Sequence, residues 1–68
     1  MSTFVEIGRI IKKTRIQKGW TQKDLAERLG LKQPNISLIE KGKVNLTLET
    51  LTKIAKVLGI DKIELKFS

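Results

Sequence analysis

Four glycines divide this chain of 68 residues into segments of helical length, and they constrain its fold more than any other feature. Each follows a stretch in which apolar residues recur every three or four positions; they are Gly19, Gly30, Gly42 and Gly59. This spacing predicts amphipathic helices, and a glycine after the last periodic residue is a common left-handed helix end. The segments predict helices at 4–18, 22–29, 33–41 and 48–58, within one small all-α domain.

Three of the predicted helices begin with recognisable start signals. Thr3 and Glu6 have the spacing of a capping box, in which each side chain bonds the other residue's backbone N–H. Thr21 and Asp24 have the same spacing, and Thr47 precedes the last predicted helix as an N-cap residue. Leu46 with Leu51, and Trp20 with Leu25, occupy hydrophobic-staple positions, so Trp20 is expected in the core. Gly8, inside the first helix, indicates close packing or a frayed first turn.

The periodicity also predicts which residues of each helix face the core. The inward positions are Ile7, Ile10, Ile11, Thr14, Leu25, Ala26, Leu29, Ile36, Ile39, Leu48, Leu51, Ile54, Ala55 and Leu58. Pro34 lies in the first turn of its predicted helix, where a missing N–H leaves no intrahelical bond unmade.

Cysteine and histidine are both absent from the sequence. Disulfides, thiolate metal sites and the usual zinc ligands are therefore excluded, together with the commonest general base and the best nucleophile. The seven Asp and Glu residues are scattered singly. We expect no metal, no cofactor and no enzymatic activity. The longest apolar run is two residues, which predicts no membrane span and a cytoplasmic protein.

Basic residues outnumber acidic ones by fourteen to seven, which gives a net charge of +7 and a pI near 10.1. The segment 9–18 contains five Lys or Arg residues and no acid, and Lys41 and Lys43 flank Gly42. Such a balance is typical of a protein that binds nucleic acid. On charge alone, an ordinary solvated surface and an anionic membrane remain alternatives.

Two short helices joined by a tight turn at Gly30 predict a helix-turn-helix over residues 21–42. In this motif the second helix enters the major groove, so one of its sides must be apolar and the other free. Ile36 and Ile39 supply the apolar side. The free side carries glutamine and asparagine amides, which can pair with adenine. Its residues are Gln33, Asn35, Ser37, Leu38 and Lys41.

The runs 21–31 and 36–42, with Thr47–Leu51 and Leu58–Gly59, resemble the repressor/Cro-type (XRE-type) helix-turn-helix family. The resemblance covers residues 5–60. It implies a lambda-repressor-like bundle of about five short helices that binds double-stranded DNA as a homodimer. Such a protein would be associated with the nucleoid, and no membrane partner is expected.

The resemblance also implies roles for individual residues. Base edges would be read by Lys32, Gln33, Asn35, Ser37 and Leu38. DNA phosphates would be bound by Gln22, Lys41, Lys43 and Asn45. A structural ion pair would join Arg15 to Glu40. Pro34 and Leu38 depart from the polar residues common at their positions, which reduces hydrogen-bonded base reading. Alternatives remain for several of these roles. Asn35 and Ser37 could simply be solvated residues, and Leu38 could be partly packed. Gln22 could serve only to start its helix, and Arg15 could bind a phosphate.

Residues 61–68 form a separate C-terminal segment. Ile63, Leu65 and Phe67 alternate with charged residues, which predicts a strand with one apolar face. Because residues 1–60 offer no second strand, we expect this strand to pair with that of a second chain. The alternative is irregular chain packed on Phe4 and Val5. The predicted arrangement is similar to HipB-type antitoxins.

The sequence thus predicts a dimeric, sequence-specific repressor on a palindromic operator. Two other functions remain open. One is an antitoxin that neutralises a toxin protein and autoregulates its operon, and the other is a basic architectural protein without sequence preference.

Overall fold

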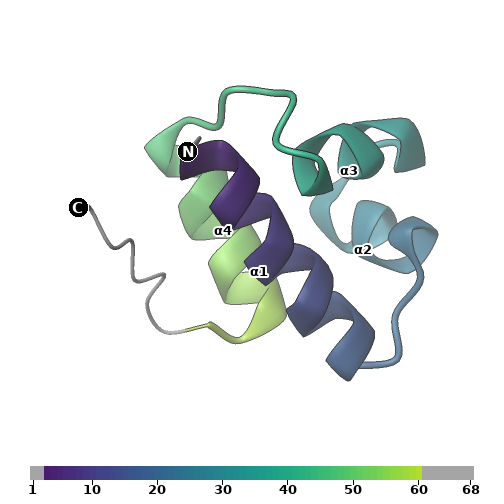
Figure 1. Cartoon of the computed structure of the whole chain (residues 1–68). Helices are drawn as coiled ribbons and strands as arrows, with labels where there is room; N and C mark the ends of the chain where they lie inside the picture. The colour runs from purple at the N-terminus through teal and green to yellow at the C-terminus, as the bar shows by residue number, and fades with distance from the viewer. Residues whose placement is uncertain (1–2, 61–68) are drawn as a thin grey trace.

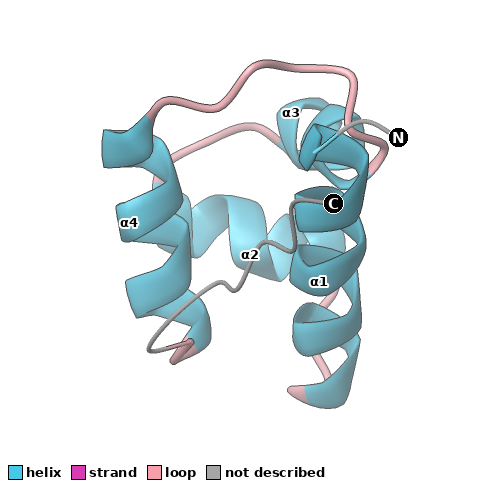
Figure 2. Ribbon diagram, turned by 60° about the vertical axis from the view of Figure 1, so that its left-hand side comes forward, coloured by secondary structure: helices cyan, strands magenta, loops and turns pink. Residues whose placement is uncertain are grey.

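The computed structural model describes residues 3–60, and this part of the chain contains four α-helices (Figure 1). They are α1 (Thr3–Gln17), α2 (Gln22–Leu29), α3 (Gln33–Glu40) and α4 (Leu48–Leu58). α1 packs against α3 and α4, and α2 packs against the same two helices. Figure 2 shows α2 lying behind the space between α1 and α4, which closes the core from that side. The all-α prediction is confirmed.

The predicted helix ranges agree closely with the structure. The ranges of α2 and α4 are as predicted, while α1 and α3 end one residue earlier and α1 starts one residue earlier. Such differences are within the usual uncertainty of helix ends. Because Thr3 already belongs to α1, it does not occupy the N-cap position that the predicted capping box with Glu6 required.

The predicted number of helices needs correction, and the predicted C-terminal strand lies outside the described residues. The family resemblance implied about five helices, but residues 3–60 form only four. Between α3 and α4 the chain forms a turn at Lys41 and Gly42, where Gly42 is left-handed with φ of 72°, and then a loop over residues 43–47. Gly59 is also left-handed and ends α4. The predicted strand at 61–68, with Ile63, Leu65 and Phe67, lies outside the described residues.

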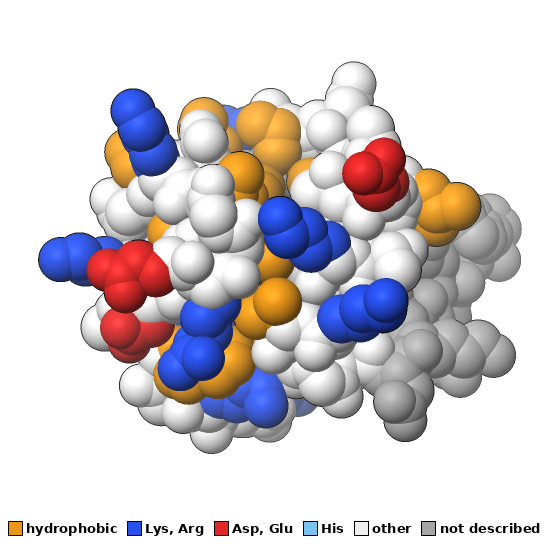
Figure 3. All heavy atoms as spheres, turned by 180° about the vertical axis from the view of Figure 1, so that it is seen from behind, with side chains coloured by type: hydrophobic (Ala, Val, Ile, Leu, Met, Phe, Trp, Pro, Cys, Tyr) orange, Lys and Arg blue, Asp and Glu red, His pale blue; other side chains and the backbone are white. Residues whose placement is uncertain are grey.

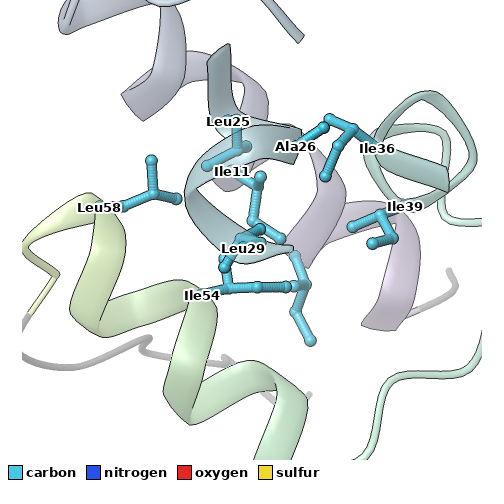
Figure 4. Close-up of a cluster of buried hydrophobic side chains, with 9 residues drawn as sticks. Ile11, Leu25, Ala26, Leu29, Ile36, Ile39, Ile54 and Leu58 are labelled. Atoms are coloured by element: carbon cyan, nitrogen blue, oxygen red, sulfur yellow. The ribbon is translucent and has the colours of Figure 1, made fainter. Parts of the chain in front are cut away.

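The core is a single cluster contributed by all four helices (Figure 4). Its buried side chains are Ile7, Ile11, Leu25, Ala26, Leu29, Ile36, Ile39, Ile54 and Leu58. Trp20 packs against this cluster while half-buried, as its staple position predicted. These nine buried hydrophobic residues all belong to the predicted inward set.

Leu48 was also predicted to face the core, but 81% of its surface is exposed. A helix turns by about 100° per residue, so Leu48, six positions before Ile54, points about 120° away from it. Leu58, four positions after Ile54, differs in direction by only about 40° and is buried. The prediction that Leu48 faces the core was therefore wrong.

The backbones of α1 and α3 approach each other closely at Gly8. A Cβ atom at this position would lie 2.5 Å from the Glu40 carbonyl oxygen and 2.6 Å from that of Ile39. Glycine is required here because these neighbours are backbone atoms at the C-terminal end of α3. Of the two explanations for Gly8, close packing is the one that the structure supports, and it fixes where α3 lies on α1.

Candidate nucleic-acid interface

α3 is anchored on one side and exposed on the other. Ile36, Ile39 and Glu40 are buried, while Leu38 is 40% exposed although it is a large apolar residue. No side chain caps the N-terminus of this helix, which Lys32 precedes. Among residues 3–60, the outer side of α3 is therefore exposed to solvent.

The residues that the resemblance assigned to base edges lie at the start and along the outer side of α3. Four of them are exposed and Ser37 is half-buried; the exposed ones are Lys32, Gln33, Asn35 and Leu38. Their side chains can therefore reach a duplex without rearrangement of the core.

The residues assigned to phosphates lie on two segments beside α3. Lys41, Lys43 and Asn45 are exposed in the chain that follows α3, and Gln22 is the half-buried first residue of α2. Figure 3 shows basic side chains spread across one face of the molecule rather than gathered in one patch. The structure brings Gln22 next to Gln33, a proximity that the sequence did not reveal.

Arg15 and Glu40 form the ion pair that the resemblance implied. The Arg15 Nε atom lies 2.6 Å from Glu40 Oε2, and Nη2 donates to Oε1 at 3.1 Å. Both side chains are nearly enclosed, with exposed fractions of 10% and 3%. Arg15 Nη1 also donates to the Trp20 carbonyl oxygen at 2.8 Å. One guanidinium thus joins α1, the chain before α2 and the end of α3.

Two glutamines extend this ion pair to the exposed surface. Gln22 Nε2 donates to Glu40 Oε1 at 3.0 Å, and Gln33 Nε2 donates to Gln22 Oε1 at 2.6 Å. Sequence reasoning missed both bonds, because Gln22 lies eighteen positions from Glu40 and eleven from Gln33. No local spacing signals such contacts.

Trp20 carries a second feature that the sequence did not reveal. The Arg28 guanidinium carbon lies 4.1 Å from the centre of its ring, and Lys18 Nζ lies 5.2 Å from it. These are cation–π distances, so the Trp20 ring holds a basic residue from the last turn of α2 and one from the chain before that helix.

The capping box predicted at the start of α2 is present. The Asp24 N–H donates to Thr21 Oγ1 at 3.0 Å, and the Thr21 N–H donates to Asp24 Oδ2 at 2.9 Å. The bond from the Thr21 backbone stabilises the ionised carboxylate and lowers the pKa of Asp24 below its ordinary value of 3.8.

Residues 11–65 of this chain match the family described as Helix-turn-helix, which comprises XRE-type domains. The chain belongs to this family. Gly30, in the short turn between α2 and α3, has a left-handed φ of 69°.

Curated relatives of this helix-turn-helix protein include antitoxin HipB of Escherichia coli K12, which is 42% identical over 55 residues. That alignment covers 81% of this chain and 62% of the antitoxin. The uncharacterized HTH-type transcriptional regulator y4dJ of Sinorhizobium fredii is 36% identical over 59 residues. That alignment covers 87% of this chain and 77% of the y4dJ chain. The chain spans about half of a Neisseria meningitidis hypothetical transcription factor, with 48% of that protein covered.

Among solved structures, the restriction-modification controller protein C.AhdI of Aeromonas hydrophila has a similar fold. Its TM-score is 0.78 at 31% identity, with 85% of this chain and 84% of that chain covered. Within residues 3–60 of the helix-turn-helix protein, no helix has the length and apolar character needed to cross a membrane.

Proposed function

We propose that this protein is a sequence-specific, double-stranded DNA-binding transcriptional regulator that acts as a repressor. The observation that carries this proposal is the exposed side of α3, where Gln33 and Asn35 are exposed while Ile36 and Ile39 are buried against the core. Membership of the helix-turn-helix family and the relatives named as transcriptional regulators support it. The net charge of +7 favours a polyanionic partner.

In the proposed complex α3 enters the major groove, and its amides bond to base edges. The exposed part of Leu38 would contact a thymine methyl group, an apolar contact that needs no hydrogen bond. Lys41, Lys43 and Asn45 would bind phosphates on the adjoining backbone and so set the register of α3 in the groove.

We propose further that the regulator is a homodimer on a palindromic operator. Two α3 helices related by a two-fold axis would then read half-sites about 34–36 Å apart. Pairing of strands at Ile63, Leu65 and Phe67 stays a prediction, since these residues lie outside the described part of the chain. A chain that ends at Asp61 should sediment as a monomer, and an unchanged dimer would show that dimerisation does not need the tail.

Selection of bound duplexes from a random pool, at one fixed salt concentration, tests the proposed function. A sequence-specific regulator should enrich a palindrome, and equal binding of all duplexes would instead favour an architectural protein.

Two variants separate base reading from phosphate binding on the selected operator. Gln33→Ala should weaken operator binding by about 1–3 kcal/mol and leave random DNA nearly unaffected, because a base contact is lost. Lys43→Ala should weaken both duplexes similarly and reduce the salt slope by about one unit, because a phosphate contact is lost. An equal loss on both duplexes for Gln33→Ala would contradict its proposed role.

A second function is favoured by the similarity to antitoxin HipB. In this alternative the protein would also bind a toxin protein and repress the operon that encodes both. Co-expression with the product of the neighbouring gene tests it: a stable complex of the two purified proteins would support an antitoxin, and two separate peaks in gel filtration would count against it.

A further inference from the structure

The outer side of α1 carries basic side chains beside an exposed isoleucine, and the proposed DNA contacts do not use it. Ile16 lies nine positions after the buried Ile7, so at about 100° per residue the two side chains point to opposite sides of the helix. Ile16 is 57% exposed although it is a large apolar residue. Arg9, Lys12 and Lys13 lie one and two turns before it, and all three are exposed.

These side chains border a shallow hollow of about 460 Å³ on the surface of α1. We call its lining the α1 outer face, and it consists of Arg9, Lys12, Lys13, Ile16 and Gln17. Most of this lining is apolar, since Lys and Arg side chains contribute methylene groups as well as charge. The α1 outer face thus offers an apolar surface bordered by three positive charges.

The charges of this face are all of one sign. Within residues 3–60 the one ion pair joins Arg15 to Glu40, so the cations of the α1 outer face meet no carboxylate in that part of the chain. A hollow on α4 offers a comparison, because it is lined by the exposed Leu48 and two lysines but also by Glu49. Of these two hollows, the one on α1 is therefore the better fit for an acidic partner.

Charge and apolar surface together indicate which partner would cover the α1 outer face. A second copy placed across a two-fold axis would bring the three cations against each other, which is destabilising. DNA phosphates would neutralise the cations but would leave Ile16 against a charged backbone. An acidic polypeptide satisfies both requirements, because its carboxylates meet the cations while an apolar side chain covers Ile16.

We propose that the α1 outer face binds an acidic helical segment of a partner protein. The segment presents one large apolar residue to Ile16 and carboxylates one and two helical turns away, which is the spacing of Lys12, Lys13 and Arg9 from Ile16. The proposal goes beyond DNA binding and does not depend on it, because the α1 outer face contains none of the residues assigned to bases or phosphates.

A synthetic helical peptide with this pattern, a leucine with glutamates one and two turns away, is the probe. In nitrogen–proton NMR spectra of the full chain it should shift the backbone signals of residues 9–17 and leave those of Asn35 and Lys53 in place. Peptides with serine for the leucine, or lysines for the glutamates, should bind at least about fivefold more weakly. Absence of shifts at residues 9–17 with the first peptide overturns the proposal.

Two matched pairs of variants separate this face from general charge and hydrophobicity. Lys12→Glu should weaken peptide binding about fivefold or more, whereas Lys53→Glu makes the same change in net charge on the exposed side of α4 and should have little effect. Ile16→Ser should also weaken binding about fivefold, and Leu48→Ser should not. All four residues are exposed, and circular dichroism verifies that each variant is folded. Equal losses within either pair overturn the proposal.

Measurements without the peptide test the other occupants. Duplex DNA should shift signals of α3 and leave those of residues 9–17 in place, and equal shifts in both regions would assign the α1 outer face to DNA. The signals of residues 9–17 should not change with protein concentration, and a change would assign the face to a second copy. Either result overturns the proposal.

The outcomes also distinguish this proposal from the proposed function. Peptide binding at residues 9–17 by a protein that binds no duplex supports the inference and overturns only DNA binding. Duplex binding at α3 without peptide binding at residues 9–17 leaves the proposed function standing and overturns the inference.

Discussion

α2 and α3 are both eight residues long and pack against each other, but they are held in place by different interactions. α2 begins with a complete capping box at Thr21 and ends at the left-handed Gly30. α3 begins after Lys32 without any side-chain cap, although it too is followed by a left-handed glycine, Gly42. Its support comes instead from Gly8 and Arg15 on α1, both far away in sequence.

The difference shows how a short helix can be fixed while its outer surface stays free. Capping side chains occupy the N-terminus of α2. α3 is instead held on its core-facing side, by burial of Ile36 and Ile39 and by the ion pair of Glu40 with Arg15. A helix of eight residues is too short to be stable by itself in water, so α3 depends on these tertiary contacts. If α2 depends on its local caps and α3 on tertiary contacts, then substitutions at the two kinds of contact should differ in their cost to stability, with the largest cost at the ion pair.

Removal of Glu40 should have the largest effect, because it leaves the Arg15 guanidinium buried without its carboxylate. Glu40→Ala should lower the free energy of unfolding by about 3–5 kcal/mol, which is most of the stability of a small domain. Urea unfolding followed by circular dichroism measures this loss. Glu27→Ala, an exposed carboxylate on α2, is the control and should change stability little. Similar losses in the two variants would contradict the importance of the buried pair.

Gly8→Ala should break the close approach of α1 to α3. The added methyl group would meet two backbone carbonyl oxygens of α3 at 2.5 and 2.6 Å, so the helices must separate. A loss of about 1–3 kcal/mol in unfolding free energy is expected from such overpacking, although alanine favours helix by about 1 kcal/mol over glycine. The same urea titration measures it, with Lys12→Ala on the exposed side of α1 as control. Stabilisation by Gly8→Ala would show that α3 does not rest on this contact.

The two N-cap positions offer a direct comparison of the helices. Thr21→Ala removes the bond to the Asp24 N–H and should cost about 1 kcal/mol. Lys32→Ala, at the same position of α3, removes no capping bond and should leave stability nearly unchanged. Thermal unfolding of both variants measures the difference, and equal costs would show that α2 and α3 start in equivalent ways.

The smallest expected effect is the pH dependence contributed by Asp24. Its pKa is lowered in the folded protein, mainly by the bond from the Thr21 backbone N–H, so in acid the unfolded chain binds the proton more readily. The contribution is therefore complete above the ordinary value of 3.8 and is lost as the pH falls through the lower folded-state pKa. Asp24→Asn should be less stable than wild type at pH 6, and the gap should narrow toward pH 2. A constant gap would contradict this account.

The sequence by itself determined the local structure of this protein. The glycines and the Thr21 and Thr47 caps fixed the helix ranges, because capping bonds join residues only a few positions apart. Periodicity identified the nine buried hydrophobic residues, and the family pattern pointed to the exposed side of α3 and to the ion pair of Arg15 with Glu40.

Only the tertiary structure decided how these helices meet. It placed Gly8 against the end of α3, left Leu48 exposed, and joined Gln22 to both Glu40 and Gln33. These contacts depend on the angle and depth at which one helix packs on another. The residues involved are eleven or more positions apart, and no spacing along the chain encodes that geometry.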